Sequence, residues 1–336
     1  MFRSIRIAFF IFLLFAVKQA TAQTIQYPKS FTVAPDGSGD YRTIQEAINN
    51  VRDLSQQQVT IRIKKGIYHE KLVVPQWKPN IYLLGDDPKE TIITNSDYSG
   101  KVIPTGKDGF GKDMFSTYTS YTLLVEGNNF KAENLTIENA AGRLGQAVAL
   151  HVEADKCSFI NCRLLGNQDT LYATNDTSRQ LYQNCYIEGT TDFIFGAATA
   201  VFQNCTLKSL TNSYITAAST IARQKFGYVF INCKLIADSG VSKVFLGRPW
   251  RPNAKVVFIN CEMGAHILPQ GWNNWGNTAN EQTVFYGEYN SKGPGAAPDD
   301  RAKWSRQLSS KEIKDYTIKT IFSGSDDWEP TASSKP

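Results

Sequence analysis

The sequence predicts an all-β fold, a single-domain right-handed parallel β-helix with a short N-terminal capping helix. A short motif recurs along the chain and consists of an apolar residue, a spacer and Asn-Cys. The segments around it are rich in Val, Ile, Phe, Tyr and Thr and contain no helical heptads. Its spacing of 22, 23, 20, 28 and 28 residues is typical of a solenoid. The recurring asparagines, the first of them in a degenerate copy without Cys, are Asn139, Asn161, Asn184, Asn204, Asn232 and Asn260.

Each repeat is then one coil of the helix, and equivalent residues of successive coils stack about 4.8 Å apart. The Cys, Phe and Ile residues would point inward as ladders in the core, because Cys behaves as a small hydrophobe. The 6 cysteines are too sparse for a disulfide scaffold, and Cys157 and Cys162 lack the spacing of a CxxC zinc pair. Whether the stacked neighbours Cys185 and Cys205 are bridged stays open, because a disulfide can span that separation.

The two ends of the chain differ from the repeats. The stretch 41–50 follows the turn 36–40 and predicts a short amphipathic helix with an N-cap. We expect this helix to cover the first coil, because an open solenoid end exposes strand edges. The polar stretch 299–323 is expected to cap the other end. No interdomain linker occurs, so we interpret residues 23–330 as one domain, followed by a frayed tail at 331–336.

Residues 1–22 have the layout of a secretory signal peptide. Arg3 and Arg6 precede the apolar run 7–17, and Ala-Thr-Ala at 20–22 supplies a small-residue cleavage site. The apolar run is short for a membrane span, and an uncleaved anchor is the alternative. Cleavage would remove three basic residues and lower the formal net charge from +5 to 5 − 3 = +2. We therefore expect a secreted or periplasmic protein, monomeric and without membrane contact after cleavage.

The composition excludes several classes of protein. With 42% hydrophobic and 12% aromatic residues among 336, the chain is too apolar for disorder. Only 3 His residues argue against a His-rich metal centre. The chain lacks the long Lys/Arg run that would indicate a nucleic-acid partner. A mildly positive balance suits a polyanionic partner without selecting one.

The repeat places polar side chains on one face. Asp169 and Asp192 each lie 8 residues after the Asn of their coil, and Gln146 lies 7 after Asn139, while Gln168 adjoins Asp169. Two neighbouring carboxylates cannot both ionise cheaply, so one pKa rises and the pair can supply an acid and a nucleophile. Amide N–H groups could stabilise an oxyanion. From spacing alone, a solvated ladder of Asn, Asp and Gln is the alternative.

These residues stand within five motifs that resemble those of the pectin methylesterase family, carbohydrate esterase family 8. The broader resemblance runs from Phe31 to Trp304. It implies a right-handed parallel β-helix, in agreement with the repeat. It also implies an enzyme that hydrolyses the methyl esters of pectin (methyl-esterified homogalacturonan) to methanol and pectate, with no cofactor and no metal. The motifs are Gly66–Glu70, Gln146–Leu150, Gln168–Tyr172, Gly189–Gly196 and Leu246–Trp250.

The resemblance also implies a role for each residue. Asp192 would attack the ester carbonyl, and Asp169 would protonate the departing methanol and then activate the water that resolves the acyl-enzyme. Gln146 and Gln168 would stabilise the oxyanion. Arg248 would hydrogen-bond Asp192 and keep it ionised, which an always-charged planar guanidinium suits.

Aromatic residues in or beside the motifs are candidates for binding the sugar rings. Trp250, Tyr172 and Phe195 could pack their flat rings against sugar faces, although core packing is the alternative for each. Thr117 and Trp272 are weaker candidates for substrate contact. His69, His151 and His266 lack ligand spacing and are interpreted as structural.

One stretch departs from plant-type members of the family. They commonly carry Gln-Gly-Arg after a Thr-Ala, whereas residues 215–220 read Ile-Thr-Ala-Ala-Ser-Thr, closer to bacterial-type members. The departure bears on subsite contacts and leaves the catalytic set intact.

Other functions on the same solenoid remain alternatives. A pectate lyase would need a calcium-binding acidic cluster. A polygalacturonase would be expected to carry Gly-His-Gly, and a serine esterase Gly-x-Ser-x-Gly, and neither motif occurs. A catalytically dead carbohydrate-binding β-helix would be expected to have lost one of Gln146, Asp169, Asp192 or Arg248, and all four are present.

Overall fold

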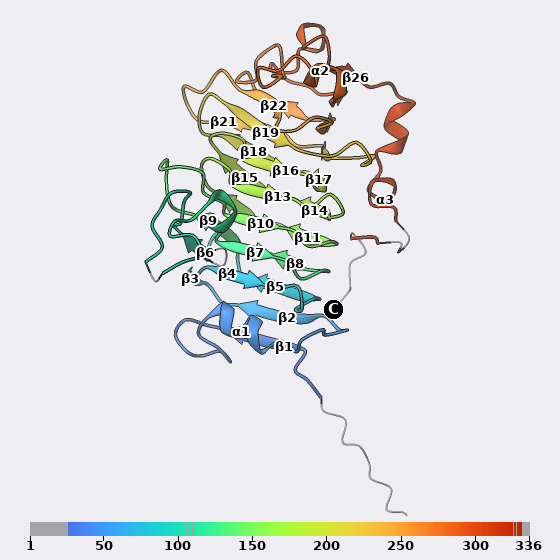
Figure 1. Cartoon of the computed structure of the whole chain (residues 1–336). Coiled ribbons are helices and arrows are strands. Elements are labelled where there is room, and N and C mark those ends of the chain that lie inside the picture. The colour runs from blue at the N-terminus through green and yellow to red at the C-terminus, as the bar shows by residue number, and fades with distance from the viewer. Residues whose placement is uncertain (1–25, 105, 109–110, 325, 327, 331–336) are drawn as a thin grey trace, which may run out of the picture.

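The computed structural model describes residues 26–104, 106–108, 111–324, 326 and 328–330. The predicted signal peptide at 1–22 and the tail at 331–336 lie outside these residues. Figure 1 shows the chain as a stack of coils that rises from the blue N-terminal strands to the orange C-terminal ones. Each coil contributes strands to three parallel sheets. The predicted parallel β-helix is therefore confirmed.

A typical coil passes through the first sheet, then the third and then the second, as β11, β12 and β13 do. The first sheet contains β1 (Ser30–Val33), β2 (Val59–Ile63), β5 (Ile81–Gly85), β8 (Lys131–Glu133), β11 (Cys157–Ile160), β14 (Arg179–Gln183), β17 (Thr199–Gln203), β20 (Tyr228–Ile231), β23 (Lys255–Ile259), β25 (Phe285–Tyr289) and β26 (Arg306–Gln307). The second sheet contains β4 (Leu72–Val74), β7 (Leu123–Val125), β10 (Leu150–Val152), β13 (Leu171–Ala173), β16 (Ile194–Gly196), β19 (Tyr214–Ala218) and β22 (Phe245–Pro249). The third sheet contains β3 (Gly66–His69), β6 (Thr91–Asn95), β9 (Thr136–Asn139), β12 (Arg163–Leu165), β15 (Tyr186–Gly189), β18 (Thr206–Ser209), β21 (Lys234–Ala237) and β24 (Glu262–Met263).

The repeated asparagines form the turn between the first and third sheets. From Asn161 to Asn260 their φ angles lie between 50° and 55°, the left-handed region that Asn tolerates better than most residues. The assignment of Asn139 to this ladder was wrong. The equivalent residue is Asn134, with φ 56°, whose side-chain oxygen accepts a hydrogen bond from Asn161 Nδ2 at 2.7 Å. The sequence concealed this copy because Leu135 stands where the other coils have Cys.

Asn139 has a different structural role. It ends β9, is buried, and its side-chain amide donates to the carbonyl oxygens of Asp97, Ser120 and Val148 at 2.9, 3.0 and 3.0 Å. These bonds tie the segment that follows β6 and the turn before β10 to the third sheet. A buried amide with three satisfied bonds is a strong local constraint.

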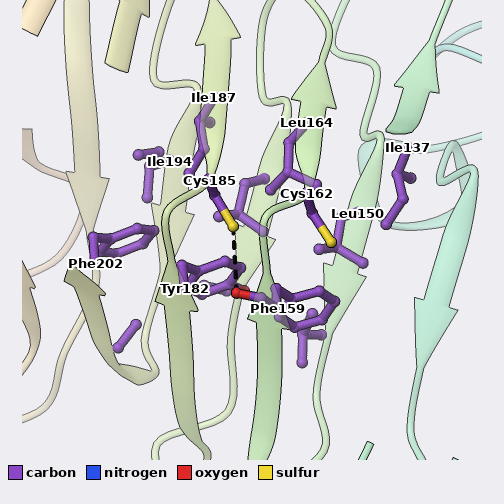
Figure 2. Packing of buried hydrophobic residues seen from close by; sticks show 14 of the residues in the cluster. Ile137, Leu150, Phe159, Cys162, Leu164, Tyr182, Cys185, Ile187, Ile194 and Phe202 are labelled. Atoms are coloured by element: carbon purple, nitrogen blue, oxygen red, sulfur yellow. Dashed lines mark hydrogen bonds between the residues drawn. The ribbon is translucent and has the colours of Figure 1, made fainter. Parts of the chain in front are cut away.

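The core consists of ladders of identical kind from coil to coil. The rings of Phe159, Tyr182, Phe202, Phe230 and Phe258 stack in sequence, with centroids 5.0, 4.7, 4.5 and 4.4 Å apart. Figure 2 shows the first three of these rings on the inner side of the strands, close to Cys162 and Cys185. All 6 cysteines are buried and free. Cys185 and Cys205 are therefore unbridged, and their thiols donate instead to the carbonyl oxygens of Phe159 and Tyr182.

The N-terminal end of the solenoid is covered as predicted. Helix α1 (Ile44–Asn50) begins after Thr43, whose Oγ1 accepts from the Glu46 amide, and it buries Ile44, Ala47 and Ile48. The carboxylate of Glu70 accepts from the amides of Ile44 and Gln45 at 2.9 and 3.0 Å. A carboxylate at a helix N-terminus satisfies free N–H groups, so Glu70 of the first motif holds the cap in place.

The C-terminal segment only partly acts as the predicted cap. Trp304 packs on Tyr286 of the last long coil, and β26 extends the first sheet. Beyond them the chain turns and runs back along the outside of the first sheet, where α3 (Ile318–Ile321) lies at the side of the stack in Figure 1. The outer face of that sheet carries an apolar stripe that includes Val201 and Val229. Leu308, Ile321 and Phe322 cover this stripe and remove it from water. Within the described ranges, no helix combines the length and apolarity needed to cross a bilayer.

Candidate active site

The candidate site lies on the outer face of the second sheet. Strand register there aligns residues from five successive coils in one row, although they are 21 to 31 positions apart in the sequence. The row consists of His151, Tyr172, Phe195, Ala217 and Arg248.

The two aspartates stand side by side in the turns that lead into β13 and β16. Pairing of Leu171 with Ile194 places Asp169 next to Asp192 on the neighbouring coil. Both have left-handed backbones, with φ of 67° and 48°, and both side chains are buried. Their amides donate to the carbonyl oxygens of Thr191 and Tyr214, so the turns are fixed by the coil that follows. The structure thus brings together the carboxylates that the repeat placed on one face.

The Arg248 guanidinium binds the Asp192 carboxylate through two parallel hydrogen bonds. Its Nε lies 3.0 Å from Oδ1 and its Nη2 lies 2.6 Å from Oδ2. The guanidinium is sandwiched between the rings of Tyr214 and Trp275, at 4.0 and 3.7 Å from their centroids. Paired bonds fix the orientation of the carboxylate, and the two rings hold the cation by cation–π attraction.

The two carboxyls have different electrostatic surroundings. Burial raises the pKa of Asp169 to about 8, and the charge of Asp192 adds to the rise, while Gln146 and Arg248 oppose it. Burial also raises the pKa of Asp192, but the hydrogen bonds and charge of Arg248 oppose that rise directly. Near neutral pH the pair therefore holds one proton, on Asp169, and Asp192 carries the negative charge.

Gln146 reaches the site by a route that the spacing did not predict. Register places Val148, and not Gln146, opposite Asp169, because the connection from β9 to β10 is longer than the connection from β12 to β13 and a fixed count from an asparagine does not hold there. The Gln146 side chain nevertheless hydrogen-bonds Asp169 and lowers its pKa. Gln168, half-buried, lines a polar groove of about 320 Å³ with its neighbour Asn167.

An aromatic floor adjoins the carboxyls. Tyr172 and Phe195 stack with centroids 4.4 Å apart and an interplanar angle of 13°. Trp250 presents its edge to both rings, at 6.4 and 5.9 Å. Tyr172 and Trp250 are half-buried and offer surface to a ligand, whereas Phe195 is 4% exposed and supports them from below.

Two of the predicted substrate contacts are buried side chains. Trp272 is 2% exposed and packs inside the coil against Phe258 and Tyr286, so its assignment to substrate binding was wrong. Thr117 belongs to the short 3₁₀ helix η1 (Thr117–Thr119) and is also buried, with its carbonyl oxygen accepting from Ser120 Oγ at 2.8 Å. Position in the sequence gave no indication of either burial.

Three residues near the floor were not predicted as site residues. Tyr118 is 46% exposed with its ring 5.5 Å from Tyr172, and Trp275 is 39% exposed over Arg248. His151, interpreted as structural, belongs to the row itself, and its ring packs against Tyr172 with centroids 4.6 Å apart and planes tilted by 44°. Tyr118 and Trp275 stand in irregular segments without periodicity. Only the exposure of a large aromatic side chain identifies them.

Comparison with known proteins agrees with this geometry. The sequence profile of the family described as Pectinesterase matches residues 30–325. Pectinesterase 31 of Arabidopsis thaliana is 40% identical over 290 residues, which cover 83% of this chain and 88% of that protein.

Solved structures are equally similar in fold. Pectin methylesterase from carrot superposes with a TM-score of 0.80 at 35% identity, covering 89% of this chain and 94% of the other. Pectin methylesterase PemA from Erwinia chrysanthemi gives 0.75 at 29% identity, covering 91% and 99%. A pectin methylesterase solved in complex with a hexasaccharide gives 0.75 at 30% identity, covering 90% and 98%. The chain belongs to the pectinesterase family.

Proposed function

We propose that this protein is a pectin methylesterase in which Asp192 is the nucleophile and Asp169 the general acid and base. The observation that carries the proposal is the arrangement of the two adjacent carboxyls. One of them is held ionised by two bonds from Arg248, and the other is held protonated by burial. An acyl transfer needs a charged nucleophile and a proton donor within reach of one carbonyl group.

The reaction then proceeds in two steps. An Asp192 oxygen attacks the carbonyl carbon of a methyl-esterified galacturonate unit, and the carbonyl oxygen becomes an oxyanion near the amide groups of Gln146 and Gln168. When the oxyanion collapses, the bond to the methoxy group breaks, and Asp169 transfers its proton to that group to form methanol. This step leaves an anhydride between the substrate and Asp192.

Hydrolysis of the anhydride restores the enzyme. Asp169, now ionised, takes a proton from a water molecule whose oxygen attacks the substrate carbonyl carbon. The anhydride bond breaks, Asp192 leaves as a carboxylate, and the sugar unit is released as a free acid that ionises in solution. The same residue serves as acid and then as base, which requires a pKa near the working pH.

The test is methanol release from highly methyl-esterified pectin, with polygalacturonate as the substrate that has no ester. The wild-type protein is expected to release methanol from the first only. Asp192→Ala should abolish methanol release, because Arg248 hydrogen-bonds no other carboxylate among the described residues. Retained turnover in this variant, with a folded protein, would refute the proposed nucleophile.

Several finer statements belong to the same proposal. We propose export of the chain by the leader at 1–22, a monomeric state and a domain over residues 23–330, each of which can be measured on the expressed protein. The bacterial-type character of the stretch 215–220 also stays a proposal. Plant relatives reach 40% identity and the Erwinia structure 29%, so the comparisons do not favour it.

A further inference from the structure

A hollow adjoins the aromatic floor on the side of the earlier coils. It has a volume of about 470 Å³, and its walls include Tyr118 and Tyr172. His151 and Glu153 of the same coil also line it, and Asp108 and Lys112 lie at its rim. Because the Tyr172 ring belongs both to this hollow and to the floor beside Asp169, a sugar chain lying over the floor would extend into the hollow.

Two glutamates lie on consecutive coils here, and one of them, Glu153, lines the hollow. Glu126 and Glu153 directly follow β7 and β10, whose pairing places them side by side. Glu153 Oε1 lies 3.0 Å from His151 Nε2, and this contact with His151 lowers the pKa of Glu153. Burial raises the pKa of Glu126, and the negative charge of Glu153 adds to the rise. Glu153 is therefore an anion whose side chain is 46% exposed, and Lys112 is the cation among the residues that line the hollow.

The opposite end of the floor carries a cation. The exposed Arg251 lies over the Trp250 ring at 4.7 Å, and its Nη1 donates to the Trp250 carbonyl oxygen at 3.0 Å. Among the described residues, no carboxylate lies within 4 Å of this guanidinium, whereas the nearby Arg223 pairs with Asp176 at 2.5 Å. Tyr172 lies between the two ends and is influenced by both charges. Burial raises the pKa of Tyr172, the charge of Glu153 adds to the rise, and the charge of Arg251 opposes it.

We propose that Glu153 and Arg251 make the groove discriminate between esterified and de-esterified sugar units at its two ends. The end at Glu153 accepts the uncharged methyl ester and rejects the galacturonate carboxylate, while the end at Arg251 binds the carboxylate. Like charges repel and unlike charges attract, and at these exposed side chains salt weakens both effects. The inference rests on the proposed function and specifies which units flank the reacting ester.

The test compares kcat/KM for methanol release from pectin of high and of low methyl esterification, for wild-type and variant enzymes. The ratio of the two values is the readout, because a loss of folded enzyme lowers both values equally. In Glu153→Gln we expect the high-to-low ratio to fall roughly fivefold, because low-ester pectin is no longer repelled. In Arg251→Gln we expect the ratio to rise roughly threefold, because carboxylate binding is lost. Salt should reduce the wild-type ratio.

The matched control is Glu262→Gln, the same change of charge at an exposed position on the third sheet. This variant should keep the wild-type ratio. If Glu153→Gln and Arg251→Gln also kept it, or shifted it in the reverse directions, the inference would be overturned while the esterase activity stood. Absence of methanol release by the wild-type enzyme from either pectin would overturn both proposals.

Discussion

Two columns of side chains run along the same solenoid, and they differ in how uniform they are. The inner column, which begins with Phe159 and Tyr182, repeats one kind of residue, and its rings lie within 13° of parallel. The outer row on the second sheet changes residue type at almost every coil, from His151 through Ala217 to Arg248. Strand register aligns the residues of the inner column and those of the outer row equally strictly. The inner column stabilises the fold by uniform burial, whereas the outer row places different functional groups beside one another.

The difference extends to the polar groups. Inside, the thiols of Cys185 and Cys205 each donate to a carbonyl oxygen of the preceding coil. Outside, Asp169 and Asp192 are buried acids that share one proton, which is unfavourable for stability. A change in the outer row should therefore act mainly on activity, and a change in the inner column mainly on stability.

The largest loss of activity beside the outer row is expected for Asp169→Asn, which keeps the shape of the side chain and removes the acid. We expect methanol release to fall by roughly 10²–10⁴-fold, the range of general acid–base catalysis. The measurement is the rate of methanol release from highly esterified pectin, with circular dichroism as the check of folding. A variant that kept more than a tenth of the wild-type rate would show that another group protonates the leaving methanol.

The corresponding substitution in the inner column is Phe202→Ala, which is expected to lower the stability of the fold. Phe202 is fully buried and lies between the rings of Tyr182 and Phe230, so its loss opens a cavity that rigid strands cannot close. We expect destabilisation of about 3–5 kcal/mol. Chemical denaturation measures it, and the fraction that remains folded should keep the wild-type kcat. A strong loss of kcat at full folding would contradict the separation of the two columns.

The uniform column was the part that could be predicted from the sequence. Repetition of Asn-Cys and of an aromatic residue specifies register, so the sheets and the inward ladders followed from it. The prediction went wrong at the first copy, where Leu135 breaks the pattern and Asn139 imitates it. A coil of this fold is predicted from the repeated motif and not from the strand propensity of its residues. One substitution in the motif is therefore enough for a coil to be missed.

The irregular segments could not be predicted in this way. Trp272 and Trp275 are three residues apart, yet one is enclosed between Phe258 and Tyr286 and the other covers Arg248. Trp275 and the adjacent Gly276 both have left-handed backbones, with φ of 62° and 67°. The glycine is typical of a turn, but a tryptophan rarely adopts this conformation, so its orientation could not be predicted. Which of two nearby tryptophans faces the groove depends on that turn, and therefore on tertiary contacts that no sequence pattern encodes.

The electrostatic cost of the buried aspartate pair beside the outer row predicts a pH-dependent stability. The pKa of Asp169 is raised from 3.8 to about 8 by folding, so between about pH 4 and pH 8 the native state retains a proton that the unfolded state has lost. Stability therefore decreases as pH rises through this window. Asp169→Asn removes the effect. Relative to wild type we expect its Tm to be similar at pH 4 and higher by roughly 5 °C at pH 8, from differential scanning calorimetry. An equal Tm at both values would indicate an unperturbed carboxyl.

The smallest effect is expected for the thiols of the inner column. Since all 6 cysteines are free and buried, a mild reductant has no bond to break, and dithiothreitol should leave the Tm unchanged to within about 1 °C. A bridge between Cys185 and Cys205 would close a loop of the unfolded chain, and its reduction would cost about 2–4 kcal/mol. Cys205→Ala is the matched variant: it should lose about 1 kcal/mol through the cavity alone, equally with and without reductant. A reductant-dependent Tm in the wild type that disappears in this variant would show that the two coils are covalently joined, and the inner column would then owe part of its stability to a bond and not to packing.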